Sequence, residues 1–202
     1  MIKHIPNVLT VFRLVLVPVF LVFLFIAPHD QLWRLGATLV FVVAVLTDLF
    51  DGQIARKYEV VSDFGKLWDP IADKAITGAA FIGLSILGEL WWWVTILILI
   101  REWGITIMRV VMLKYQVMAA ALGGKWKTML QCIALTILLL YPLGLPFGPV
   151  IDWIIASVGW IIMGIALIFT VVTGGMYVRD ALKLKREAAQ PAEVAAEAEV
   201  AE

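Results

Sequence analysis

The sequence predicts an all-α fold: an integral membrane bundle of six transmembrane helices, with both the N- and the C-terminus in the cytoplasm. Three observations support this prediction, namely the composition, six separate apolar runs and the positions of the basic residues. Of the 202 residues, 62% are hydrophobic and only 16% are charged, whereas a soluble domain carries about 25% charged residues. This apolar excess argues against an ordinary soluble domain.

Six apolar segments are long enough to be considered as spans, because a helix needs about 20 mostly apolar residues to cross a bilayer. They centre on residues 8–27, 35–57, 70–88, 91–113, 127–143 and 152–178. The first segment lacks a small-residue cleavage site, so we expect a retained span and not a signal peptide. Residues 1–186 are expected to form one membrane domain. The Ala/Glu-rich tail, residues 187–202, is expected to be disordered or a loose helix.

The basic residues predict the orientation, because they accumulate in cytoplasmic loops. They lie near the N-terminus, between spans two and three, between spans four and five, and after span six; the opposite loops hold only Arg34. The even number of spans agrees with two cytoplasmic termini. We therefore expect a multi-pass protein of the cell membrane whose polar site faces the cytoplasm.

Four aspartates lie inside the predicted spans, where a charge costs at least about 2.5–3.5 kcal/mol. Asp48 and Asp51 are three residues apart and Asp69 and Asp73 are four apart, so each pair shares a helix face. Opposed carboxylates repel unless cations lie among them, and oxygen ligands suit Mg²⁺ or Mn²⁺. We expect two such ions, as in phosphoryl-transfer sites. Asp69 has an alternative structural interpretation as an N-cap before Pro70.

The aspartates belong to a longer pattern with eight specified positions. The pattern resembles the signature of the CDP-alcohol phosphatidyltransferase family, and it reads Asp48-x2-Asp51-Gly52-x2-Ala55-Arg56-x8-Gly65-x3-Asp69-x3-Asp73. The resemblance implies a helical membrane enzyme, usually a homodimer. Such an enzyme uses CDP-diacylglycerol and an alcohol whose hydroxyl attacks the β-phosphorus, so that CMP leaves.

The same resemblance implies roles for individual residues. Asp48, Asp51 and Asp69 are expected to bind metal, and Asp73 is expected to be the general base and a ligand of the second metal. The residues expected to hold the CDP-lipid are Asn7, Thr10, Gly52, Arg56 and Ser62. No further cofactor and no nucleic-acid partner are expected.

The alcohol acceptor is predicted from other residues. The segments IPNVLTVFR, DPIADK, REWGITIMR and GGKWKT resemble those of bacterial phosphatidylglycerophosphate synthases within the family, which implies sn-glycerol 3-phosphate as acceptor. Candidates for binding its phosphate are Arg101, Arg109, Lys125 and Lys127. These cations could instead be ordinary cytoplasmic anchors.

Three other interpretations stay open. Inositol phosphate or phosphatidylglycerol could be the acceptor for the same chemistry. A non-catalytic membrane protein that binds or transports cations could use the same carboxylates, although it would leave Gly52 and Arg56 unexplained.

Overall fold

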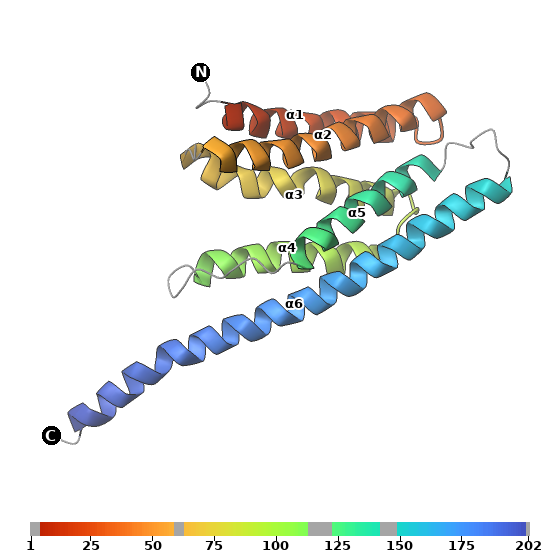
Figure 1. Cartoon of the computed structure of the whole chain (residues 1–202). Helices are drawn as coiled ribbons and strands as arrows, with labels where there is room; N and C mark the ends of the chain where they lie inside the picture. Colours follow the sequence, from red (N-terminus) through yellow and green to blue (C-terminus); the bar gives the residue numbers. More distant parts are fainter. Residues whose placement is uncertain (1–4, 59–62, 113–122, 142–148, 201–202) are drawn as a thin grey trace.

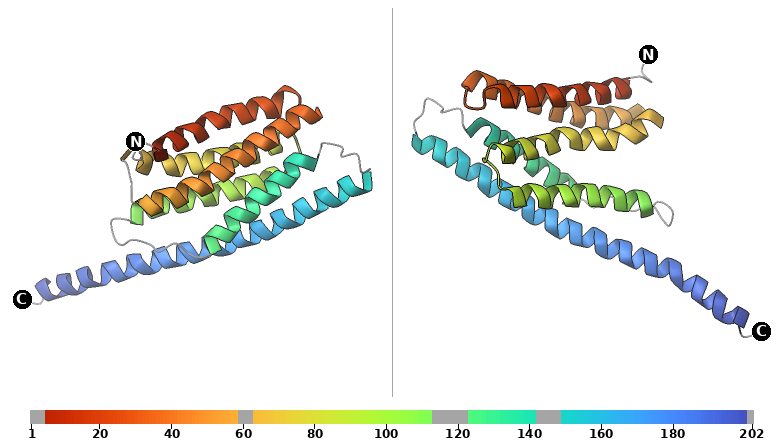
Figure 2. Two further views of the ribbon diagram at one scale, coloured as in Figure 1. Left: turned by 45° about the horizontal axis from the view of Figure 1, so that its top comes forward. Right: turned by 180° about the vertical axis from the view of Figure 1, so that it is seen from behind.

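The computed structural model describes residues 5–58, 63–112, 123–141 and 149–200, with side chains for 8–48, 71–72, 74–108, 126–141 and 150–184. This part of the chain is helical apart from short connecting turns, and it has no strand. Its helices are α1 (Ile5–Ile26), α2 (Gln31–Tyr58), α3 (Asp63–Ile86), α4 (Trp92–Met112), α5 (Gly123–Leu140) and α6 (Pro149–Val200). They run roughly alongside one another, and both chain ends lie at the same end of the bundle (Figures 1 and 2).

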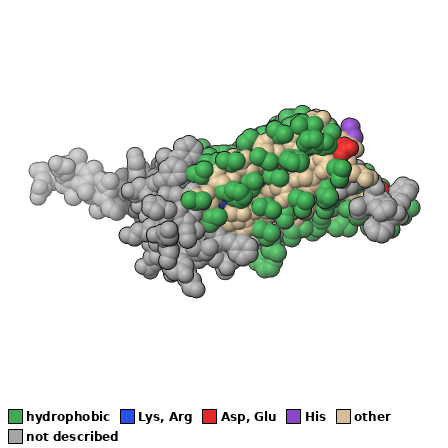
Figure 3. All heavy atoms as spheres, turned by 90° about the horizontal axis from the view of Figure 1, so that it is seen from above, with side chains coloured by type: hydrophobic (Ala, Val, Ile, Leu, Met, Phe, Trp, Pro, Cys, Tyr) green, Lys and Arg blue, Asp and Glu red, His purple; other side chains and the backbone are tan. Residues whose placement is uncertain are grey.

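The described helices agree with the predicted all-α class, and the candidate spans agree with a membrane-embedded protein. Among the described residues, three segments are long and apolar enough to cross a bilayer: Val8–Ile26, Gln31–Asp48 and Val150–Leu184. This part of the chain also contains two shorter apolar helices, Lys74–Ile86 and Trp126–Leu140. Apolar side chains are spread over the described part of the face drawn in Figure 3, which suits contact with lipid tails.

Two helix bounds differ from our expectations. Helix α3 begins at Asp63, so Asp69 lies inside the helix and its interpretation as an N-cap before Pro70 is wrong. The backbone nitrogen of a proline carries no hydrogen, so the helix continues through Pro70 with one backbone hydrogen bond fewer. Helix α6 continues through residue 187 to Val200, so the structure gives most of the tail a helical backbone. The separation of a tail from the domain at residue 187 stays a prediction.

The core is shared by all six described helices, from Phe20 in α1 to Met163 in α6. It contains aromatic and branched side chains that are fully buried, among them Phe20, Leu24, Phe41, Phe81 and Leu135. The helices approach closely at Gly83, where a Cβ would lie 2.5 Å from Leu24 Cδ2. A larger residue there would force the fully buried Leu24 side chain to shift.

A turn at Gly88 connects α3 to α4. Gly88 has a positive φ of 75°, which glycine adopts without strain. The Glu89 N–H donates to the Leu84 carbonyl at 2.9 Å and the Gly88 N–H to the Ser85 carbonyl at 3.1 Å. This pair of bonds is a Schellman motif, which satisfies the last carbonyls of the helix. It also fixes the backbone of Glu89 beside α2.

Arg34 joins three parts of the bundle at this end. Our expectation placed Arg34 in a loop, but it lies in α2 and is only 1% exposed. Its guanidinium pairs with Glu89 and donates through Nε to the Leu139 carbonyl at the end of α5, at 2.9 Å. We call this arrangement the Arg34 clamp. It compensates a buried charge and satisfies a carbonyl in the last turn of α5.

Candidate active site

The four predicted aspartates lie on two helices that contact each other. Asp48 and Asp51 are in α2, and Asp69 and Asp73 are in α3. Only Asp48 has a described side chain, which is 41% exposed and forms an ion pair with Arg13 of α1. The structure therefore confirms that the pairs are carried by neighbouring helices, while the meeting of all four carboxylates stays a prediction.

Arg13 is a site residue that the sequence reasoning missed, because it was counted only as a basic residue near the N-terminus. Its side chain is 2% exposed, and its partner Asp48 is 35 residues away in the chain. The available signal was an arginine within an apolar helix, three residues after Thr10. Thr10 is itself fully buried on α1, so the N-terminal helix contributes polar side chains next to α2.

Several predicted site residues lie outside the described side chains. For most of them only the helical backbone is described, and Ser62 lies outside the described residues altogether; the set is Asn7, Asp51, Gly52, Arg56, Asp69, Asp73, Arg109, Lys125 and Ser62. Their assigned roles stay predictions.

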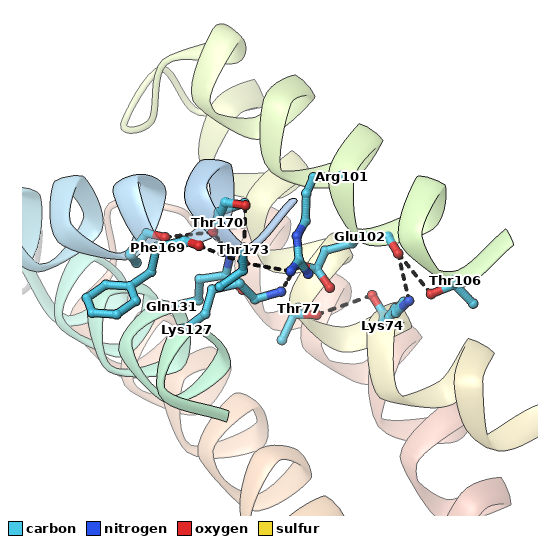
Figure 4. A network of polar contacts seen from close by, with 11 residues as sticks. Lys74, Thr77, Arg101, Glu102, Thr106, Lys127, Gln131, Phe169, Thr170 and Thr173 are labelled. Carbon is cyan, nitrogen blue, oxygen red and sulfur yellow. Dashed lines mark hydrogen bonds and ion pairs between the residues drawn. The ribbon is translucent and has the colours of Figure 1, made fainter. Parts of the chain in front are cut away.

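A second group of charged residues meets where α3, α4, α5 and α6 approach one another (Figure 4). Glu102 Oε1 accepts bonds from Lys127 Nζ and, at 3.2 Å, from Arg101 Nη1. The Glu102 carbonyl accepts a bond from Lys74 Nζ at 2.8 Å. We call these four residues the Glu102 cluster. It brings together two of the four predicted phosphate-binding cations, Arg101 and Lys127.

Three side chains, two of α6 and one of α5, complete the polar surroundings of the cluster. Arg101 Nη2 donates to Thr173 Oγ1 at 2.8 Å, and Gln131 Nε2 donates to Thr170 Oγ1 at 3.1 Å. Thr173 in turn donates to the Phe169 carbonyl at 2.6 Å, as Figure 4 shows. Arg101 is thus held from both sides, by Glu102 on its own helix and by Thr173 across the gap.

The cluster combines burial with an excess of positive charge. The side chains of Lys127, Arg101 and Glu102 are 2%, 12% and 20% exposed. The cluster brings the cationic groups of Lys127 and Arg101 to one carboxylate, and such surroundings suit an anionic phosphate. Lys74 follows Asp73 directly in α3, so the cluster lies next to the backbone that carries the predicted base.

The donor set fits a hard divalent cation. Four carboxylates on two contacting helices supply only oxygen ligands, which is the chemistry of Mg²⁺ and Mn²⁺ sites. The ion pair of Asp48 with a buried arginine shows that this carboxylate already attracts a cation. Among residues with described side chains, no three potential ligands form a metal site; Asp51, Asp69 and Asp73 lie outside that search.

Known proteins resemble this chain over most of its length. Residues 3–172 match the family model described as CDP-alcohol phosphatidyltransferase. A protein of Mycobacterium tuberculosis named probable phosphatidylglycerophosphate synthase is 44% identical over 90% of this chain and 83% of that protein. Proteins named CDP-diacylglycerol–glycerol-3-phosphate 3-phosphatidyltransferase are 40% identical in Rickettsia typhi, over 87% of this chain and 95% of that protein, and 35% identical in Bacillus subtilis, over 86% and 93%. The chain is thus a member of the CDP-alcohol phosphatidyltransferase family.

Proposed function

We propose that this protein transfers the phosphatidyl group of CDP-diacylglycerol to sn-glycerol 3-phosphate and releases phosphatidylglycerophosphate and CMP. The names of its relatives support this reaction. The observation that carries the choice of acceptor is the Glu102 cluster. It places two guanidinium or ammonium groups, Arg101 and Lys127, together beside the helix of the predicted base.

The chemistry requires a base at the acceptor and charge compensation at the diphosphate. Asp73 takes the proton of the acceptor hydroxyl, whose oxygen forms a bond to the β-phosphorus while the bond from that phosphorus to the bridging oxygen breaks, so that CMP leaves. Two Mg²⁺ or Mn²⁺ ions held by Asp48, Asp51, Asp69 and Asp73 supply charge stabilisation when bound. The CDP-lipid is held by Asn7, Thr10, Gly52, Arg56 and Ser62.

The acceptor is recognised by its phosphate. Arg101 offers a planar fork that matches phosphate oxygens, and Lys127 adds a point charge. Arg109 and Lys125 lie on the same two helices and complete the proposed set. A neutral alcohol such as inositol would leave the buried cations Arg101 and Lys127 without a substrate partner.

The proposed setting is the cell membrane, crossed by six helices, with the active site and both termini at the cytoplasmic face. The common end of the two termini supports an even number of crossings (Figures 1 and 2). The basic residues at the end of α2 and the start of α3, and those around the link from α4 to α5, support that side as cytoplasmic. We further propose a homodimer, on the family resemblance alone.

The test is CMP release by the purified protein in detergent with CDP-diacylglycerol and Mg²⁺. Glycerol 3-phosphate should support turnover, and inositol phosphate, phosphatidylglycerol and neutral alcohols should not. Asp73→Asn should abolish turnover while the CDP-lipid still binds, and Asp180→Asn, at an exposed carboxylate of α6, should leave turnover unchanged. Turnover with inositol phosphate only would refute glycerol 3-phosphate as the acceptor. Cation binding without CMP release would refute the proposal that the protein is an enzyme.

A further inference from the structure

Glu102 is a carboxylate in the midst of the cations that we assign to an anionic substrate. By charge alone it opposes phosphate binding, because like charges repel. Yet it is the residue that Arg101 and Lys127 both contact, and Lys74 contacts its carbonyl (Figure 4). This arrangement calls for a role that outweighs the repulsion.

The burial of Lys127 explains why a carboxylate is needed at this place. The Lys127 side chain is 2% exposed, and an ammonium so far from water is stable only with an anionic partner. The two other cations of the cluster make its position harder to keep, since each repels it. Without the Glu102 carboxylate, Lys127 would turn away from the cluster, and the phosphate would lose one of its ligands.

Arg101 depends less on Glu102 for its position than Lys127 does. It keeps its bond to Thr173 and lies over the Tyr177 ring, with its Cζ 5.9 Å from the ring centroid. Glu102 therefore orients only one nitrogen of the Arg101 guanidinium. For the Lys127 ammonium, in contrast, Glu102 is the only partner among the described residues.

We propose that Glu102 is a positioning residue, whose carboxylate holds Lys127 and Arg101 together as one binding site for the phosphate of the acceptor. This inference rests on the proposed function. Glu102 itself touches no substrate atom in the proposal. Its effect is to keep two cations charged, close together and aimed at one place before the acceptor arrives, so that binding does not have to order them.

The inference predicts a selective change in the kinetics of Glu102→Gln, which keeps the shape of the side chain and removes its charge. The KM for glycerol 3-phosphate should rise about 10- to 100-fold, the range expected for losing one or two charge-assisted bonds. The KM for CDP-diacylglycerol should stay within about twofold. Inhibition by inorganic phosphate should weaken in parallel with the acceptor KM.

Glu102→Asp is the conservative variant, because it keeps the charge with a shorter reach. Its acceptor KM should lie between those of wild type and Glu102→Gln. If Glu102→Gln does not fold, Glu102→Asp provides the test of the inference instead. Asp180→Asn is the matched control, since it removes a carboxylate that is far more exposed. A thermal melt of each variant separates a loss of folding from a change in binding.

Three results would overturn the inference: an unchanged acceptor KM in Glu102→Gln, a lower KM, which would mean that repulsion dominates, or an equal rise in both KM values, which would mean a general structural role. The proposed function fails differently. If wild-type protein releases no CMP with glycerol 3-phosphate, the acceptor assignment is wrong, whatever the variants do.

Discussion

Glu89→Ala tests the Arg34 clamp, because it removes the carboxylate that compensates a guanidinium only 1% exposed. Removing one partner of a buried ion pair costs about 3–5 kcal/mol. The Glu89 side chain retains 18% exposure, and the Nε bond to Leu139 remains, so we expect the lower end, about 3 kcal/mol. For a chain of this size that corresponds to a Tm lower by about 6–12 °C.

The assay is a thermal melt of the purified protein in one detergent, at pH 7.5 and fixed ionic strength. The control is Asp180→Ala, which breaks the exposed pair of Arg179 and Asp180, 78% and 52% exposed. Exposed pairs contribute about 0–1 kcal/mol, so the control should melt near wild type. The reasoning is refuted if Glu89→Ala lowers Tm no more than Asp180→Ala does.

The double variant Arg34→Met/Glu89→Ala gives a further check on the cause. If the cost of Glu89→Ala comes from an uncompensated buried charge, removing that charge should recover part of the lost Tm. If the cost comes from lost packing of the Glu89 side chain, the double variant should melt lower than either single variant.

The clamp also gives a dependence on pH. Burial raises the pKa of the Glu89 carboxyl above its ordinary 4.5, and the charges of Arg34 and His29 offset this only in part. The folded state therefore binds this proton more tightly than the unfolded chain does. The resulting stability is fully present below pH 4.5 and is lost as the pH rises through the raised pKa. The Tm of wild type minus that of Glu89→Gln should thus fall as the pH rises from 4.5 through the raised pKa of Glu89; a rise would contradict the shift.

The remaining predictions concern the packing at Gly83, the bond that orients Arg101 and the metal ions. Gly83→Ala should be less stable than Gly104→Ala by about 1–3 kcal/mol in matched melts, because its Cβ meets Leu24 Cδ2 at 2.5 Å while that of Gly104 meets nothing within 4 Å; equal Tm values would contradict this packing. Thr173→Val removes the 2.8 Å bond to Arg101 and should raise the acceptor KM roughly fivefold, whereas an unchanged KM would show that this bond does not orient the guanidinium. EDTA should abolish CMP release and added Mg²⁺ should restore it; full activity in EDTA would exclude the proposed ions.

The local pattern of the sequence predicted the helices because apolar length and turn residues are local properties. The predicted run 91–113 corresponds to α4, and 8–27 corresponds to α1, within a few residues. The start of α3 was missed because Pro70 is a strong local signal for a helix start, and a helix that passes through it depends on its surroundings. Local helix propensity therefore does not predict that α3 continues through Pro70.

The charged site was predicted unevenly for a similar reason. Fixed spacing along single helices identified the aspartates and placed Arg101 on the correct helix. In contrast, Lys127 lies 25 residues from its partner Glu102, and Asp48 lies 35 residues from its partner Arg13, each on another helix. Which charges meet is decided by how the helices pack, and a single sequence has no periodic signal for that.

The Arg34 clamp has a consequence for how the chain is assembled during synthesis. Glu89 is made 55 residues after Arg34, and Leu139 is made 105 residues after it. At about 5–20 residues per second, the arginine waits roughly 3–11 s for its carboxylate and roughly 5–21 s for the carbonyl. The first helical hairpin thus enters the membrane with an unsatisfied guanidinium, and this end of the protein reaches its final form only after α5 has been inserted.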